Sequence, residues 1–273
     1  MPESPSVPPP APPPALEPLL WRALGFDEPP AGRPPVAAIV GAGGKTSLLY
    51  RLGREASALG RRVVLCGTAR YTGTTHAEQP LVLRDAEERL PARVVEAWAR
   101  GVGAVLASGV DPERPERLVP LSPATIAALA RLEGLDGLFI EADGSRMRPF
   151  KAPAEHEPAV PAAATHVVAL VGLDALDAPL DAAHVHRPER VRAICDRPTC
   201  DAGLIARVLA SPQGGRKYVD ERAFVVVVNK ADLDPAAAMR LADRIAAMGV
   251  PRVVVTRLRN EAAPVVAVIA SPR

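Results

Sequence analysis

A three-layer α/β fold with a mostly parallel sheet is the class that this 273-residue sequence predicts. Segments rich in β-branched residues alternate along the chain with segments of helical periodicity, which is typical of a sheet covered by helices. The run 224–228 (FVVVV) is apolar at every position, as expected of a strand buried on both faces. A glycine-rich turn joins the first predicted strand to the first predicted helix.

The predicted elements follow one another from residue 36 onward. Gly60 and Gly101 end the first two helices, and Ser122-Pro123 begins the third as an N-cap followed by a first-turn proline. Pro91 breaks or begins the second helix. The expected strands are 36–40, 62–66, 103–107, 137–141, 165–171, 224–228 and 252–256, and the expected helices are 45–59, 83–100, 122–132 and 235–248.

The turn between the first strand and helix reads IVGAGGKTS and resembles a phosphate-binding loop. Its spacing, G-x-x-G-K-T, is two residues shorter than the common G-x-x-x-x-G-K-[ST] pattern, yet it keeps the strand, the glycines and the helix that phosphate binding needs. A short loop of this kind is also the pattern of the Mur-type amide ligases, which use ATP. The predicted nucleotide-binding residues here are Gly41, Ala42, Gly43, Gly44, Lys45, Thr46 and Ser47, with the Thr46 hydroxyl as a ligand of Mg²⁺.

A second stretch, LFIEADGS, ends the strand 137–141 with two acidic residues. Glu141 and Asp143 are two residues apart, so they point to the same side of the strand. P-loop proteins keep the carboxylate that orients Mg²⁺ or the attacking water at such a strand end. We predict catalytic roles for both and a metal-ligand role for Asp143, and the sequence leaves open which of the two acids holds Mg²⁺.

The loop 146–158 follows directly and carries several charges. It lies after the carboxyl end of a strand, where open α/β sheets bind ligands. Arg146, Arg148 and Lys151 are candidates for holding an anionic substrate or the γ-phosphate, and a charged surface loop is the alternative. Lys151 is one of only four lysines, beside 29 arginines among the 33 basic residues, which favours the functional interpretation.

A third stretch, VVVNKADL, matches the Asn-Lys-x-Asp pattern with which GTPases recognise guanine. Asp232 would accept hydrogen bonds from the N1–H and the 2-amino group of the base, and Asn229 would contact its far edge. Lys230 is the third nucleotide-binding residue predicted in this stretch. Adenine lacks the matching donors, so a carboxylate in this position would discriminate between the bases. The alternative is a structural strand end followed by an Asp234 helix cap, so the sequence leaves ATP and GTP both open.

Composition limits the partners and the domain organisation. Residues 1–16 are proline-rich and are expected to form a disordered tail, and 17–273 are expected to form a single P-loop NTPase-like domain. The net charge of +2 predicts neither a nucleic-acid nor a membrane partner, and three cysteines at irregular spacing are no disulfide framework. We see no signal peptide and no apolar run of about 20 residues, so a cytoplasmic protein is expected.

Two histidine-containing stretches are weaker candidates. The segment His184-x-His186-Arg187 could supply metal ligands or substrate contacts, but the sequence favours a solvated loop. The same interpretation holds for His76.

Five motifs occur together in a fixed order: VGAGGKTS, IEADGSRMRPFKAPAEHEP, VGLDAL, VHRPE and VVNKADL. With them the chain, from about residue 36 to about 255, resembles the YqeC-type proteins, which are described as accessory proteins of selenium-dependent molybdenum hydroxylases. The segment 66–72 (CGTARYT) departs from the threonine-rich stretch of that family. The resemblance implies a P-loop-like cytoplasmic protein linked to selenium cofactor biosynthesis, partnered by such a hydroxylase or its maturation machinery.

Three functional hypotheses follow. The first is a nucleotide-binding accessory protein in which Lys45 and the glycine amides bind phosphates, Mg²⁺ is held by Thr46 with an acid, and Lys151 with Arg146 stabilises transferred charge. The second is a metallochaperone GTPase, which predicts GTP preference and a Cys/His metal cluster. The third is an ATP-dependent ligase or kinase with a short Mur-like loop, which predicts ATP preference and a second substrate domain. In each case the nucleotide could also be a ligand that is never turned over.

Overall fold

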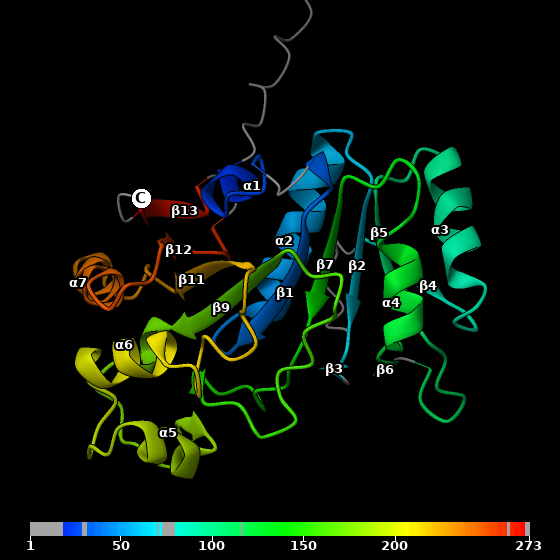
Figure 1. Ribbon diagram of the computed structural model, residues 1–273. Coiled ribbons are helices and arrows are strands. Elements are labelled where there is room, and N and C mark those ends of the chain that lie inside the picture. The colour runs from blue at the N-terminus through cyan, green and yellow to red at the C-terminus, as the bar shows by residue number, and fades with distance from the viewer. Residues whose placement is uncertain are drawn as a thin grey trace, which may run out of the picture.

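The computed structural model describes residues 19–28, 32–69, 71–72, 80–115, 117–260 and 263–270. The predicted tail 1–16 and His76 lie outside these residues. A nine-stranded sheet runs through the molecule in the order β13-β12-β11-β9-β1-β7-β2-β5-β4 (Figure 1). Its strands are β1 (Val36–Gly41), β2 (Val63–Gly67), β4 (Leu81–Arg84), β5 (Ala104–Ser108), β7 (Gly137–Glu141), β9 (His166–Gly172), β11 (Ala223–Asn229), β12 (Arg252–Thr256) and β13 (Val265–Ala270).

The sheet is mostly parallel, as the sequence predicts. Seven strand pairs are parallel, and only the terminal pair β12–β13 is antiparallel, with a register shift at Thr256. Four two-residue strands lie outside it and form two small ladders: β3 (Tyr71–Thr72) with β6 (Arg117–Leu118), and β8 (Phe150–Lys151) with β10 (Val185–His186).

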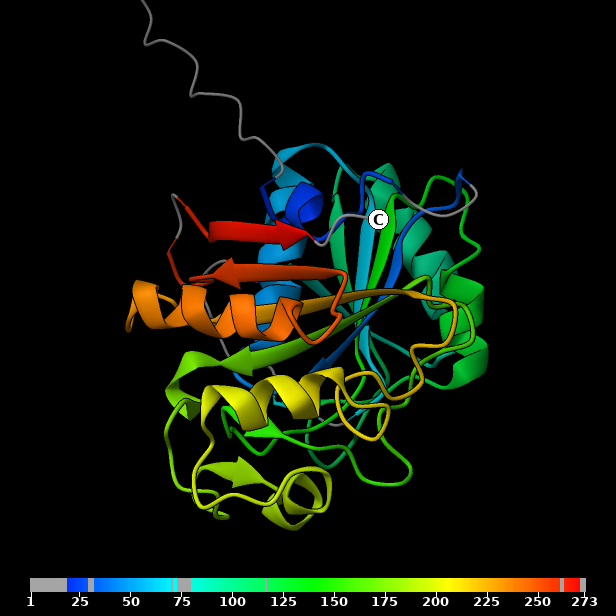
Figure 2. The same cartoon turned by 60° about the vertical axis from the view of Figure 1, so that its left-hand side comes forward.

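Helices cover both faces of the sheet and complete the three layers. They are α1 (Leu19–Ala23), α2 (Lys45–Ala58), α3 (Leu90–Ala99), α4 (Pro123–Leu129), α5 (Pro188–Ile194), α6 (Ala202–Ala210) and α7 (Pro235–Ala246). On β1, Ala37 and Ile39 pack towards α1 and α2, whereas Ala38 and Val40 pack into the core that α3 to α7 share. On that second face α6 and α7 lie side by side in both views (Figures 1 and 2). The three-layer α/β prediction is therefore confirmed.

The predicted helix 83–100 is wrong over its first half. Residues Leu81–Arg84 form strand β4 parallel to β5, and α3 begins only at Leu90 with Pro91 in its first turn. Proline has no N–H and its ring blocks the preceding helical turn, so one continuous helix could not pass through Pro91. Pairing at the sheet edge then fixes 81–84 as a strand by satisfying the backbone groups of β5.

Besides β4, three helices and five strands were not predicted: α1, α5, α6, β3, β6, β8, β10 and β13. The start of α6 could have been predicted from Asp201, a residue type that often caps helices. Its side chain accepts a hydrogen bond from the Leu204 N–H (2.8 Å). Strand β13 has alternating exposure typical of an antiparallel edge. Within the described part of the chain no helix combines the length and apolarity that a membrane crossing requires.

The strand order positions the candidate site. Strand β1 lies between β7 and β9, with Ile39 opposite Glu141 and Gly41 opposite Leu170. Strand β11 follows β9, with Asn229 opposite Gly172. Since parallel strands end at one edge of the sheet, the three predicted motifs meet there although they are far apart in the sequence.

Candidate functional site

The glycine-rich turn connects β1 to α2 without a side-chain cap. Gly43 has a φ of +81°, and a Cβ there would lie 2.1 Å from the Gly172 nitrogen, so only glycine fits against the end of β9. The N-cap residue of α2, Gly44, makes no side-chain capping bond. The first-turn N–H groups of α2 therefore have no side-chain acceptor at the N-cap and point towards the turn, the arrangement with which helix N-termini bind anions.

Lys45 is the buried cation of this turn, with 3 % of its surface exposed. Its Nζ donates to the Gly41 carbonyl oxygen (2.7 Å) and forms ion pairs with Asp143 Oδ1 (3.3 Å) and Glu141 Oε1 (3.8 Å). A cation taken this far out of water needs such partners. The lysine head group is thus held at the mouth of the turn, between it and the end of β7.

The two predicted acids make different contacts. Asp143 Oδ2 accepts a hydrogen bond from the Gly41 N–H (3.0 Å) and forms an ion pair with Lys151 Nζ (2.9 Å). Glu141 Oε2 accepts from the Thr46 hydroxyl (2.8 Å). Burial raises the pKa of Glu141 above its ordinary value, and Lys45 and Thr46 oppose that shift only in part.

The donor set fits Mg²⁺ bound together with nucleotide phosphates. Asp143 Oδ1 is buried and has no hydrogen-bond partner among the described residues, although Lys45 lies within ion-pair distance. The Thr46 hydroxyl, in the first turn of α2, is hydrogen-bonded to the Glu141 carboxylate at the end of β7, and both acids lie within ion-pair distance of Lys45. Mg²⁺ prefers oxygen ligands and in nucleotide sites takes one or two from carboxylates and others from phosphates and water, so these oxygens suffice.

Lys151 extends the cluster away from the turn and is 5 % exposed. Its Nζ contacts the Gly144 carbonyl oxygen (2.6 Å), Asp143 and Glu157 Oε2 (2.8 Å). On the other side of Glu157, the two terminal guanidinium nitrogens of Arg187 donate hydrogen bonds to its carboxylate. Burial alone would raise the pKa of Glu157, but hydrogen bonds from Arg187 and Lys151 more than offset it and lower the pKa to about 2.

Glu157 was not among the predicted site residues, and His186 and Arg187 were expected to lie in a solvated loop. The pairing of β8 with β10 sets His186 opposite Lys151 and brings the segment 184–187 to the site instead of leaving it a solvated loop. Burial lowers the pKa of His186 to about 4, with Arg187 and Lys151 adding to the effect, so its imidazole is neutral at pH 7. The stretches AEHEP and VHRPE each contain several charged residues, which could have marked them as parts of a site. That the two stretches contact each other depends on the fold and is not visible in the sequence.

Asn229, the last residue of β11, supports the turn that follows β1, although β9 lies between these two strands. Its Nδ2 donates to the Gly43 carbonyl oxygen (2.9 Å), and its Oδ1 accepts from the Thr256 hydroxyl (3.1 Å) and the Leu258 N–H (3.2 Å). Lys230 Nζ donates to Asp174 Oδ2. The Asn-Lys-x-Asp segment and the turn are therefore physically joined.

Three predicted residues lie apart from these buried contacts. Arg146 and Asp232 are exposed, and Ser47 is half-buried on the first turn of α2. Arg146 belongs to the tip of the loop 144–149, where both it and Met147 have positive φ values (47° and 63°). Arg148 Nε donates to the Ala182 carbonyl oxygen (3.0 Å) and ties that loop to the segment before β10.

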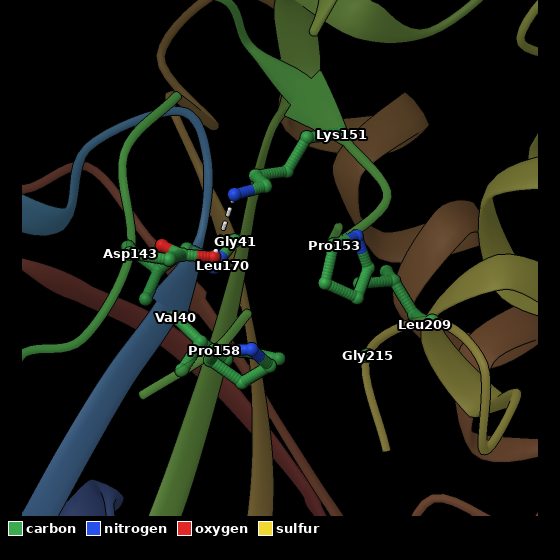
Figure 3. Close-up of a pocket in the computed structure, with 11 residues that line it drawn as sticks. Val40, Gly41, Asp143, Lys151, Pro153, Pro158, Leu170, Leu209 and Gly215 are labelled. Atoms are coloured by element: carbon green, nitrogen blue, oxygen red, sulfur yellow. Dashed lines mark hydrogen bonds and ion pairs between the residues drawn. The ribbon is translucent and has the colours of Figure 1, made fainter. Parts of the chain in front are cut away.

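A small, partly open pocket adjoins the cluster, and Gly41 of the turn is among the residues that line it (Figure 3). Asp143 and Lys151 stand at one end of it, and the other walls include Pro153, Pro158 and Leu209. In the parts of the chain that the structure describes, no group of three or more His, Cys, Asp or Glu side chains is placed as a metal site.

Two comparisons with known proteins identify the family. The sequence model described as "YqeC protein" matches residues 37–189, which include the turn, both acids, Lys151, Glu157 and Arg187. The "Uncharacterized protein YqeC" of Escherichia coli (strain K12) is 33% identical over 216 residues, covering 73% of this chain and 77% of that protein. With more than half of its length matched by the family model, and with this relative, the chain belongs to the YqeC family.

Proposed function

We propose that this protein binds a Mg²⁺-nucleotide at the turn 41–46 and uses it in the maturation of selenium-dependent molybdenum hydroxylases. One observation carries the nucleotide proposal. A buried lysine and two buried carboxylates meet where an uncapped helix begins after a glycine-rich turn. Burying charged groups costs free energy, and buried charges of this kind gather at binding and catalytic sites.

The roles follow from the contacts. Lys45 leaves its ion pairs with the acids to meet the β- and γ-phosphates, while the first-turn amides of α2 bind the same group. Thr46, Glu141 and Asp143 supply oxygen ligands for Mg²⁺. Lys151, fixed by Glu157 and Arg187, holds a positive charge beside Asp143 without free rotation, as stabilisation of a developing charge requires.

The base proposed here is guanine. The Asn229 amide joins the Asn-Lys-x-Asp segment to Gly43, so the turn that binds phosphates is fixed relative to the residues that would read the base. Asp232 stands exposed two residues beyond Lys230, with its carboxylate open to an incoming ligand. That carboxylate would accept the two donors of guanine, which adenine does not offer.

Calorimetric titration with Mg²⁺-GTP and Mg²⁺-ATP at one salt concentration tests this assignment. We expect GTP to bind at least about tenfold more tightly, since a hydrogen bond to a charged group contributes about 1.5–3 kcal/mol. Asp232→Ala should bring GTP affinity down to that of ATP and leave ATP affinity unchanged.

Asp234→Ala is the matched control. Asp234 is two residues away and caps α7 by accepting from the Ala237 N–H (2.9 Å), so its loss affects stability and not the base preference. Equal affinities for the two nucleotides in the wild-type protein would remove the guanine assignment but leave the phosphate site intact.

The role in hydroxylase maturation rests on the family resemblance. We expect a molybdenum hydroxylase purified from cells without this protein to lose selenium while keeping its molybdenum. Elemental analysis by mass spectrometry measures both, and restoring wild-type protein but not Lys45→Ala should return the selenium. An unchanged selenium content in the deleted strain would rule out the role.

A further inference from the structure

The Tyr50 hydroxyl is a buried polar group that the packing of the protein does not explain. The residue is 8 % exposed, and its hydroxyl has no hydrogen-bond partner in the part of the chain that the structure describes. Its ring belongs to the apolar core on the α1 and α2 side of the sheet, where a phenylalanine ring would pack equally well. A buried hydroxyl without a partner costs free energy, so its presence points to a partner that arrives with a ligand.

The position of Tyr50 in α2 directs its side chain to the candidate site. Tyr50 follows Thr46 by four residues, so the two side chains share one face of the helix. Aromatic side chains in helices point back towards the N-terminus, over the residue four positions earlier. The Thr46 hydroxyl donates to Glu141 Oε2 (2.8 Å). The Tyr50 hydroxyl is therefore directed to the same carboxylate from one turn further along α2.

The charges around Tyr50 agree with this position. Burial raises the pKa of Tyr50 to about 12, the charge of Glu141 adds to the increase, and the charge of Arg84 at the end of β4 opposes it. The phenol therefore keeps its proton at neutral pH and is available as a donor. The carboxylate is near enough for its charge to act on the phenol, although no hydrogen bond joins the two in the ligand-free protein.

Glu141 changes partners when the proposed ligand binds. In the ligand-free protein its carboxylate contacts the Thr46 hydroxyl and Lys45 Nζ (3.8 Å). In the proposed complex both side chains turn away from Glu141, Lys45 to the phosphates and Thr46 to Mg²⁺. A carboxylate accepts about four hydrogen bonds, so Glu141 can bind Mg²⁺ and still accept a proton donor. Carboxylates that bind metals are commonly held in orientation by such a donor.

We propose that Tyr50 is a positioning residue of the Mg²⁺-nucleotide site, an inference that rests on the proposed function. Its hydroxyl donates to the Glu141 carboxylate once the Thr46 hydroxyl has turned to Mg²⁺. One hydroxyl thus replaces another on the same face of α2, and Glu141 keeps its orientation. The hydroxyl is unpaired only in the ligand-free protein, so pairing it in the complex favours Mg²⁺ binding.

The variant Tyr50→Phe tests this role, because it removes the hydroxyl and keeps the ring. Calorimetric titration should show Mg²⁺-GTP binding about tenfold more weakly, as expected when a residue that orients a metal ligand is lost. GTP titrated in EDTA should bind the variant and the wild type equally. The ligand-free variant should melt at a temperature at least as high as that of the wild type, because it loses an unpaired group.

Tyr218→Phe is the matched control. The Tyr218 hydroxyl donates to the Glu155 carbonyl oxygen (3.2 Å) and has no contact with α2 or Glu141. The same chemical change at this position should leave the affinity for GTP as in the wild type, both with Mg²⁺ and in EDTA.

Carbon NMR of protein labelled at the tyrosine Cζ atoms reports on the hydrogen bond itself. The chain has three tyrosines, so the Tyr50 resonance is identified by its absence from Tyr50→Phe. We expect this resonance to shift when Mg²⁺-GTP is added and to stay in place when GTP is added in EDTA.

The results separate the role of Tyr50 from the proposed function. Wild-type affinity of Tyr50→Phe for Mg²⁺-GTP, an equal loss with Mg²⁺ and in EDTA, a lower melting temperature or an unmoved Tyr50 resonance would each overturn the positioning role while nucleotide binding stands. If the wild-type protein bound no nucleotide, the proposed function itself would fail, and the role of Tyr50 with it.

Discussion

Replacing Lys45 with alanine is expected to abolish measurable Mg²⁺-nucleotide binding. The Lys45 ammonium is the buried cation that the turn 41–46 holds against its own carbonyl and two acids. Its loss removes at least one charge-assisted contact with the phosphates, roughly 1.5–3 kcal/mol, or about tenfold to a hundredfold in affinity. Without Lys45 the two carboxylates also repel the incoming anion. Calorimetric titration under the conditions used for the wild type measures the loss.

Lys217→Ala provides a control for the removal of a lysine. Lys217 also binds backbone carbonyls, those of Ala154 and Glu155, but has no contact with the turn. Its replacement should leave nucleotide affinity as it is. A Lys45→Ala protein that remained folded by circular dichroism and bound nucleotide as well as the wild type would show that the turn 41–46 is no phosphate site.

Gly43→Ala should cost stability and nucleotide binding together. The residue combines a φ of +81° with a Cβ position 2.1 Å from the Gly172 backbone nitrogen, so the turn must move away from β9 to accommodate a methyl group. Left-handed backbone alone costs about 1–2 kcal/mol for a residue other than glycine, and the displacement adds to it. We expect the free energy of unfolding in urea to fall by about 3 kcal/mol or more.

Gly60→Ala separates the two contributions to that loss. Gly60 also has a positive φ (+68°), but nothing lies within 4 Å of its Cβ position. This variant should lose only about 1 kcal/mol and keep its nucleotide affinity. If both variants lost the same stability and both still bound nucleotide, the close approach of the turn to Gly172 would be unimportant.

The parts of the candidate site that could be predicted from the sequence are those that directly follow a single strand. The turn 41–46 and the acids 141 and 143 follow apolar strands, and neighbouring parallel strands end at one edge, so their meeting could be foreseen. Lys151 was also predicted as a site residue. Its partners could not be, because Glu157 and Arg187 meet only through the pairing of β8 with β10.

The remaining differences have similar long-range causes. Asn229 contacts Gly43 across 186 residues of chain, a contact that local pattern does not encode. The segment 81–84 became a strand because β5 offered an unpaired edge, which a search for helical periodicity at 83–100 does not detect. Edge strand β13 likewise depends on β12 being in place first.

Charges of alternating sign run without interruption from the turn to the protein surface: Lys45, Asp143, Lys151, Glu157 and Arg187. Each charge inside the series forms an ion pair with the charge before it and with the charge after it. Moving one side chain therefore changes two ion pairs at once. The series therefore behaves as one electrostatic unit. Removing any one of its charges leaves a neighbouring charge with one partner fewer where little water can reach it, and breaking a buried ion pair in this way is strongly destabilising.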